Sequence, residues 1–227
     1  MSSRNPKQLL FAQFALVAKA VGYADRLELL EQLGQGERSV EMLAQKASLS
    51  VASTSQHLQQ LRRAGLVDSR RDGKYVLYRL ADDDVVRLLG ALRQVAERGI
   101  AEVDRILRGY FQDRDSMEAV SREELLERSR RGLVTVLDVR PADEFAAGHV
   151  PGAVNIPLAE LERRLSELDP SHQIVAYCRS SYCVLSFEAV SLLRTRGFDV
   201  RRMEEGLPEW KAAGLPVDHD ADGHVPV

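Results

Sequence analysis

The stretch IVAYCRSSYC at residues 174–183 sets the architecture of the C-terminal half of the chain and holds both of its cysteines. An apolar run that ends at Cys178, followed by small polar residues, predicts a buried strand, a loop and then a helix. Backbone N–H groups of such a loop and of the next helical turn favour the thiolate, which is the reactive form of cysteine. The run therefore predicts a sulfur-chemistry site in which Cys183 captures what forms on Cys178. The alternative is two unrelated buried cysteines.

Strands and helices alternate around this loop. Apolar runs predict further strands at residues 134–139 and 200–203, and helices at residues 158–168 and 184–196. The alternation predicts an α/β domain whose parallel sheet is flanked by helices on both faces. Ligands of such sheets sit at the carboxyl ends of strands, which is where Cys178 lies.

Residues 117–217 resemble the rhodanese (sulfurtransferase) family in four ordered blocks, which are residues 137–140, 144–157, 177–179 and 206–217. The resemblance implies that Cys178 takes a sulfane sulfur from thiosulfate or polysulfide as a persulfide, with possible sulfurtransferase activity. It also implies that the backbone amides of residues 179–183 hold the extra sulfur or an anion. The site residues implied are Cys178, Cys183 and Arg179, then Ser180, Ser181 and Tyr182 of the loop, with Asp138 and Arg140 as supporting ion-pair residues.

One position departs from the rhodanese pattern. Many such loops close with an arginine at the sixth position, and this chain has Cys183 there, so that Arg179 is the one arginine of the loop. The change predicts weaker oxyanion affinity and a second thiol that attacks a persulfide on Cys178. The product is a disulfide or polysulfide bridge that cellular thiols reverse, and such chemistry suits a switch.

The N-terminal half predicts a mostly helical α+β fold, a winged helix-turn-helix. Ser39 and Ser50 are placed to cap two helices, at residues 39–47 and 50–64, joined by a tight turn. A strand from Leu66, a basic hairpin tip at residues 70–74 and a return strand ending at Leu80 follow. Two helices at a tight turn and a hairpin make this motif.

The second helix of that motif carries a polar face. With Leu58 and Leu61 facing the core, its polar residues are expected on the outer side, where they can contact base edges, and the basic residues can meet phosphates. His57 either contacts DNA or lies at the edge of the groove. The predicted DNA-binding residues are Ser53, Thr54, Ser55, Gln56, His57, Gln60, Arg62, Arg63, Arg70, Arg71 and Lys74.

Residues 23–80 resemble the ArsR/SmtB family of transcriptional repressors, most specifically over residues 55–67. The resemblance implies a homodimer on double-stranded operator DNA, with the first helix and a long helix at residues 82–108 in the interface. Metal-sensing members carry cysteines in the first helix of the motif, or His ligands on the later helix. Residues 40–47 contain no cysteine and residues 82–112 no His or Cys, so no metal and no other cofactor is expected.

Composition predicts a soluble protein of 227 residues with two domains, residues 1–112 and 113–227, joined by a polar linker at residues 113–116. The first domain carries a net charge of +4 and the second −7, which hints at nucleic acid for the first. No apolar run approaches the roughly 20 residues of a membrane span, so no membrane partner and a cytoplasmic location are expected.

Three functions remain open. The first is an ArsR-type repressor that senses reactive sulfur or an oxidant through Cys178 and Cys183. The second is a self-regulated sulfurtransferase, or a thiol-based reductase of arsenate or peroxide. The third is a constitutive DNA-binding protein whose sheet domain only contacts partners.

Overall fold

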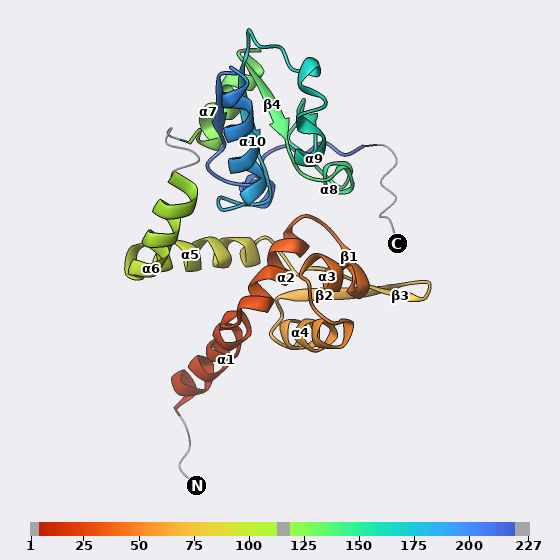
Figure 1. Cartoon of the computed structure of the whole chain (residues 1–227). Coiled ribbons are helices and arrows are strands. Elements are labelled where there is room, and N and C mark those ends of the chain that lie inside the picture. Colours follow the sequence, from red (N-terminus) through yellow and green to blue (C-terminus); the bar gives the residue numbers. More distant parts are fainter. Residues whose placement is uncertain (1–4, 113–118, 221–227) are drawn as a thin grey trace. The chain divides into compact units, whose positions relative to one another are not determined.

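The computed structural model describes residues 5–112 and 119–220 (Figure 1). Two compact units divide the chain between Val85 and Val86. The helix that follows the wing is therefore grouped with the second unit. The predicted linker at residues 113–116 lies outside the described residues, and the predicted domain boundary between residues 112 and 113 stays a prediction.

Capping side chains and a glycine set the ends of the helices in the first unit. These helices are α1 (Pro6–Val21), α2 (Ala24–Gly34), α3 (Val40–Lys46) and α4 (Val51–Arg63). Gly22 is the C-cap residue of α1 and separates it from α2. Both predicted caps are present, because Ser39 Oγ accepts from the amide of Met42 at 3.2 Å and Ser50 Oγ from that of Ser53 at 3.1 Å.

The wing is a three-stranded antiparallel sheet in the order β1-β3-β2. Its strands are β1 (Arg38–Ser39), β2 (Val67–Asp72) and β3 (Tyr75–Leu80). The predicted tip at residues 70–74 is too long, since β2 and β3 stay paired to Asp72 and Tyr75 and only two residues turn. Gly73 makes that turn with φ +57°, a conformation that favours glycine. Leu58 and Leu61 are fully buried, as predicted.

The second unit begins with interrupted helices. The single long helix expected at residues 82–108 is wrong, because α5 (Asp84–Gly99) ends and α6 (Ala101–Ile106) starts anew after it. Ile100 between them has an extended backbone, with φ −118° and ψ 104°. Glycine is a poor helix former and Ile is β-branched, so the pair ends the helix. A π-helical turn η1 (Leu107–Gln112) follows.

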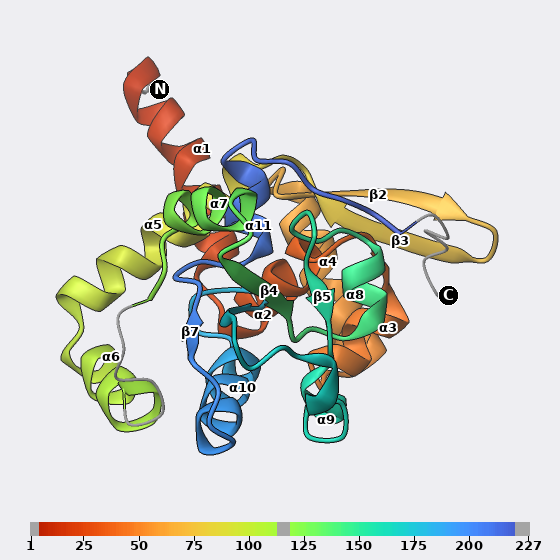
Figure 2. The ribbon, with the colours of Figure 1, turned by 90° about the horizontal axis from the view of Figure 1, so that it is seen from above.

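A four-stranded parallel sheet forms the core of the second unit, in the order β5-β4-β6-β7 (Figure 2). Its elements, in chain order, are α7 (Arg122–Arg130), β4 (Val134–Asp138), α8 (Ala142–Ala146), β5 (Val154–Asn155), α9 (Leu158–Leu161), the 3-10 turn η2 (Leu165–Glu167), β6 (Gln173–Tyr177), α10 (Val184–Thr195), β7 (Val200–Arg202) and α11 (Leu207–Ala212). The helix expected at residues 158–168 is shorter, with α9 and η2 in its place.

Apolar side chains on the two faces of this sheet alternate along each strand. Leu137 and Ala176 pack in the cluster that includes Val190 of α10, whereas Val136 and Val175 pack in the cluster that includes Leu125 of α7. Successive strand residues point to opposite faces, which gives this period of two. Helices therefore cover both faces of the sheet, as predicted.

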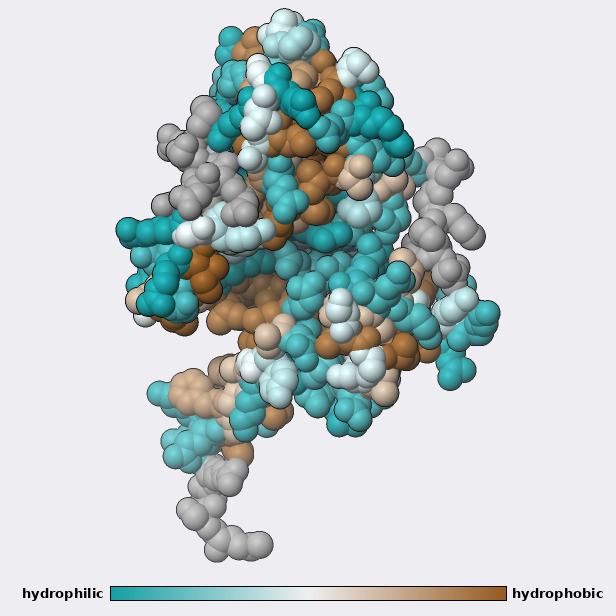
Figure 3. All heavy atoms as spheres, viewed as in Figure 1, coloured by the Kyte–Doolittle hydropathy of each residue, from teal (hydrophilic) through white to brown (hydrophobic). Residues whose placement is uncertain are grey.

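The first helix carries exposed apolar side chains. Five apolar side chains of α1 are about half exposed, and these are Leu9, Leu10, Phe11, Phe14 and Leu16. Figure 3 shows tan and brown side chains on α1 beside hydrophilic ones. Among residues 5–112 and 119–220, no helix is long and apolar enough to cross a membrane.

Candidate nucleic-acid interface and cysteine loop

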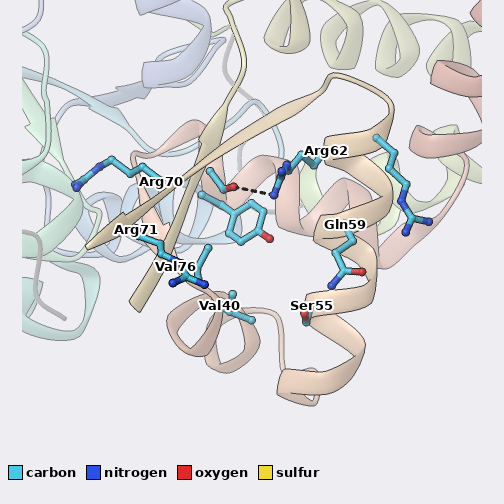
Figure 4. Close-up of a pocket in the computed structure, with 10 residues that line it drawn as sticks. Val40, Ser55, Gln59, Arg62, Arg70, Arg71 and Val76 are labelled. Carbon is cyan, nitrogen blue, oxygen red and sulfur yellow. Dashed lines mark hydrogen bonds between the residues drawn. The ribbon is translucent and has the colours of Figure 1, made fainter. Parts of the chain in front are cut away.

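A cavity of about 650 Å³ lies between α4 and the wing (Figure 4). Its walls carry side chains of three elements, which are Val40 of α3, Ser55, Gln59, Arg62 and Arg63 of α4, and Ser69, Arg70, Arg71, Val76 and Tyr78 of the wing. Arg62 donates to Ser69 Oγ at 3.2 Å and so ties α4 to β2. An open hollow lined by several guanidinium groups suits a phosphate backbone.

The polar residues predicted on α4 have different surroundings. Ser55 lines the cavity and Gln56 is exposed, while Ser53 is half-buried. Thr54 was expected on the outer side and is fully buried, because its position shares the core face with Leu58 and Leu61.

His57 and Gln60 are turned toward α2. His57 Nε2 lies 3.5 Å from Asp25 Oδ2, and the His57 ring contacts that of Tyr23 with centroids 5.9 Å apart. Gln60 Oε1 accepts from Arg26 at 2.6 Å. These partners hold both side chains along the helix pair, away from the cavity, whose walls they do not line.

The basic residues of the wing are exposed. Arg70 is bound by Glu37 at 2.6 Å and by Asp72 at 3.0 Å, and its hydrogen bond to Glu37 is the main cause of its raised pKa. Figure 4 shows Arg70 extending away from α4. Arg71 and Lys74 are exposed, and the Lys74 ammonium lies 5.0 Å from the centre of the Tyr75 ring.

Gln59 and Ser69 also line the cavity and were not predicted from the sequence. A helical spacing from Ser55 could have found Gln59, since residues four apart share a face. Ser69 had no local signal, because its place depends on the pairing of β2 with β3.

In the second unit, the loop between β6 and α10 brings the two cysteines together. Their sulfur atoms are bonded and their Cα atoms lie 6.1 Å apart. Cys178, Cys183 and Ser180 are buried, while Ser181 and Tyr182 are half-buried. Cys178 lies just beyond the carboxyl end of β6, as the strand pattern predicts, and β6 is one of the two inner strands of the sheet.

The start of α11 packs tightly on this loop. The Leu207 amide donates to the carbonyl of Cys178 at 3.2 Å. A Cβ on Gly206 would lie 2.2 Å from the carbonyl oxygen of Arg179, so only glycine fits there. Within the loop, the Cys183 amide donates to the Ser180 carbonyl at 3.2 Å. The loop is therefore braced from within and by α11.

At the carboxyl end of β4, Asp138 and Arg140 form the predicted ion pair, and both side chains are fully buried. Arg140 also donates to the carbonyl of Gly148 at 2.8 Å, so it ties the end of β4 to the next turn. Tyr177 lies beside the pair and accepts from the amide of Val150 at 3.0 Å. Burial, and then the nearby Asp138 carboxylate, raise the Tyr177 pKa well above its ordinary value.

The Arg179 side chain is paired with a carboxylate from another element. Its guanidinium donates two hydrogen bonds of 2.8 Å to Glu144 of α8, whose side chain is fully buried. The pairing of Arg179 with Glu144 was not predicted from the sequence, because 35 residues separate the two.

Tyr182 links the loop to α5 within the second unit. Its hydroxyl donates to Glu97. Burial, followed by this bond to Glu97, raises the Tyr182 pKa. Arg93 of α5 binds Glu209 of α11 at 2.7 Å, and Arg87 donates to the carbonyl of Ala212 at 2.8 Å. The loop and the helix that braces it both contact α5.

The described residues hold no group of three or more His, Cys, Asp or Glu side chains suited to a metal ion. Their chemistry is that of a dithiol and a cationic surface. The dithiol can exchange sulfur and close a bridge, and the surface can bind a polyanion.

Comparisons with known proteins match both units. Residues 24–69 match "Bacterial regulatory protein, arsR family" and residues 121–213 match "Rhodanese-like domain". "HTH-type transcriptional regulator Rv0324" of Mycobacterium tuberculosis is 44% identical over 219 residues, or 96% of each chain. "Sulfurtransferase" of Allochromatium vinosum is 32% identical over 85 residues, which cover 37% of this chain and 78% of that protein.

Among solved structures, the homodimeric winged helix-turn-helix DNA-binding domain (fragment 1–100) of Mb0332 from Mycobacterium bovis is 37% identical. It covers 44% of this chain and 93% of that fragment, with a TM-score of 0.40.

A winged helix with a cationic hollow and a parallel sheet with a cysteine loop define a transcriptional regulator that carries a rhodanese-like domain. The HTH-type regulator that is 44% identical over 96% of this chain shows the family. The chain belongs to the ArsR family of transcriptional regulators and has a C-terminal rhodanese-like domain.

Proposed function

We propose that this chain is a homodimeric repressor that releases operator DNA when Cys178 and Cys183 react with a small sulfur donor. The observation that carries the proposal is the bond between the two sulfurs in the loop where a rhodanese would carry sulfur. The exposed apolar side chains of α1 support a dimer, since surface of this kind is usually covered. The cavity between α4 and the wing supports DNA binding.

The chemistry of the switch needs only the donor and the two thiols. The Cys178 thiolate attacks the outer sulfur of a polysulfide, an S–S bond of the donor breaks, and the donor leaves one sulfur shorter. The Cys183 thiolate then attacks the Cys178 sulfur of the persulfide, whose S–S bond breaks and releases hydrosulfide. The two thiols are oxidised to a disulfide, and the transferred sulfur is reduced to sulfide. A cellular thiol reverses the bridge by exchange.

Contacts inside the second unit support a path from this chemistry to the DNA-binding half. Tyr182 is the neighbour of Cys183 in the chain and binds Glu97 of α5. When the bridge opens, Tyr182 moves with Cys183 and its bond to Glu97 changes. Because α5 follows β3 of the wing along the chain, the shift of α5 that accompanies bridging biases the dimer away from DNA.

Operator binding of the purified full chain tests this proposal. An operator is selected from random duplex DNA, and its affinity is measured by fluorescence anisotropy before and after stoichiometric polysulfide. Intact mass is measured on the same samples. We expect a loss of affinity of about tenfold or more that follows the appearance of the bridged mass. Unchanged affinity in fully bridged protein would contradict the proposal.

Two variants locate the response. Cys183→Ser should take a persulfide at Cys178 and form no internal bridge, so its response to polysulfide should be blunted. Glu97→Gln should still form the bridge but respond less, because it weakens the acceptor for Tyr182. Glu127→Gln on α7, an exposed carboxylate paired with Arg131, is the matched control and should respond like wild type.

The same samples test the sulfurtransferase alternative. The rhodanese-like match at residues 121–213 and the sulfurtransferase relative favour it. It requires steady turnover with thiosulfate and cyanide that survives Cys183→Ser and is lost in Cys178→Ser. Turnover together with operator binding that ignores the sulfur state would favour the enzyme.

A further inference from the structure

The cation nearest to Cys178 in the chain is occupied by a buried acid. Arg179 Nε and a terminal nitrogen each donate to a different oxygen of Glu144 at 2.8 Å. The Glu144 side chain is fully buried and that of Arg179 is 19% exposed. This is the bidentate geometry in which a guanidinium binds a carboxylate most strongly.

Sulfur transfer from thiosulfate is favoured by a guanidinium that can bind the sulfonate, and Arg179 is already bound to Glu144. The transfer releases sulfite, and the charge that develops on the sulfonate oxygens is stabilised by a planar fork of N–H donors. To supply that fork, Arg179 would have to leave a carboxylate that has no exposed surface. Leaving such a carboxylate without its cation is costly. A polysulfide, in contrast, releases a sulfur anion, which is a weak hydrogen-bond acceptor and does not need the fork.

The guanidinium groups on neighbouring elements are engaged as well. Arg202 of β7 donates to the carbonyl of Ser181 at 3.3 Å and to that of Met203 at 2.9 Å, and it lies over the Phe187 ring. Arg140 is held by the Asp138 carboxylate. The loop can therefore bind an oxyanion through its backbone amides, but the guanidinium groups around it are already bound to protein groups.

From this geometry we propose that Glu144 determines the donor specificity of Cys178. By neutralising Arg179 it makes the loop accept sulfur from polysulfides, which carry no oxyanion, and discriminate against thiosulfate. The inference rests on the proposed function, because it assumes that Cys178 accepts sulfane sulfur. In either case the Cys178 thiolate attacks the sulfane sulfur and the S–S bond of the donor breaks. Sulfite leaves from thiosulfate, and a shorter polysulfide leaves from polysulfide.

The test measures the rate at which reduced full-length protein gains sulfur, by intact mass, with thiosulfate or inorganic polysulfide as the probe. Glu144→Gln keeps the shape and removes the charge, so it releases the charge of Arg179 toward the loop. We expect loading from thiosulfate to rise about tenfold and loading from polysulfide to change less than about threefold. Glu160→Gln, a half-exposed carboxylate of α9 paired with Arg164, is the matched control and should change neither rate.

Two further variants exclude other causes. In the double variant Glu144→Gln with Arg179→Gln, the gain with thiosulfate should vanish. Arg179→Gln alone leaves the Glu144 carboxylate without its cation and so lowers stability. In the folded variant the ratio of the two loading rates should stay within about threefold of wild type, because Glu144 already neutralises the cation in wild type. The proposal is overturned if folded Glu144→Gln keeps the donor ratio of wild type. It is also overturned if Arg179→Gln selectively slows thiosulfate, and this second result decides the matter should Glu144→Gln fail to fold.

Wild-type protein distinguishes a wrong specificity residue from a wrong sensing function. Wild-type protein that takes sulfur from neither donor would refute the sensing function itself. Wild-type protein that prefers polysulfide but keeps its operator would leave Glu144 as the specificity residue and refute only the coupling to DNA.

Discussion

The cavity between α4 and the wing and the loop between β6 and α10 both contain arginines, and they use them in opposite ways. Around the cavity, Arg62 and Arg71 are exposed and border an open hollow. Around the loop, Arg140 is fully buried against Asp138, and Arg179 is held by Glu144. The contrast indicates that an exposed arginine stays available to an anion, whereas one bound by a buried carboxylate does not.

The acidic partners sharpen this contrast. Glu37 holds Arg70 at the surface, where the Arg70 side chain is 53% exposed, and Glu144 holds Arg179 in the interior. Water and salt screen the first pair, so the Arg70 charge is still felt by a polyanion. The second pair is little screened, and its charges cancel for anything that enters the loop.

The largest effect is expected where a buried guanidinium is removed. Arg140→Met leaves Asp138 buried without its cation, which should lower the free energy of unfolding of the second unit by about 3–5 kcal/mol. Trp210, the single tryptophan of the chain, is buried in that unit, so its fluorescence during urea unfolding reports the change.

Arg131→Met is the control for this variant. Arg131 pairs with Glu127 at 3.4 Å, and both side chains are well exposed. Its loss should cost less than about 1 kcal/mol. Equal losses for the two variants would mean that Arg140 does not have the structural role given to it here.

A smaller effect is expected where an exposed guanidinium meets DNA. Arg71→Ala should weaken operator binding about tenfold and reduce the slope of log affinity against log salt by about one. Stability should be unchanged. Arg79 of β3 is similarly exposed but does not line the cavity, so Arg79→Ala should have little effect on affinity. Affinities measured across a salt series separate the two, and equal losses would contradict the placement of DNA in the cavity.

The smallest effect concerns the surface acid. Glu37→Gln removes a negative charge beside Arg70 and should tighten operator binding about threefold at low salt, with the gain lost at high salt. Titrations at two salt concentrations measure it. If DNA affinity falls instead, then Glu37 positions Arg70 for contact rather than neutralising it.

Local patterns predicted much of both units. The serine caps at Ser39 and Ser50, the burial of Leu58 and Leu61, and the strand that ends at Tyr177 all follow from neighbours in the sequence. Helix length was less predictable. The interruption at Ile100 depends on how the weak helix former Gly99 balances against the surroundings of the helix. The prediction of one continuous interface helix did not take this balance into account.

The sequence by itself determined the two kinds of fold, the family, and the presence of two thiols where a rhodanese loop would lie, since these depend on periodicity, caps and short motifs. Only the tertiary structure decided which polar groups are available. It buried Thr54, turned His57 toward Asp25, and brought Glu144 to Arg179 and Glu97 to Tyr182. These pairings join residues far apart in the chain, and side-chain charge is cancelled or kept by whatever folding places beside it.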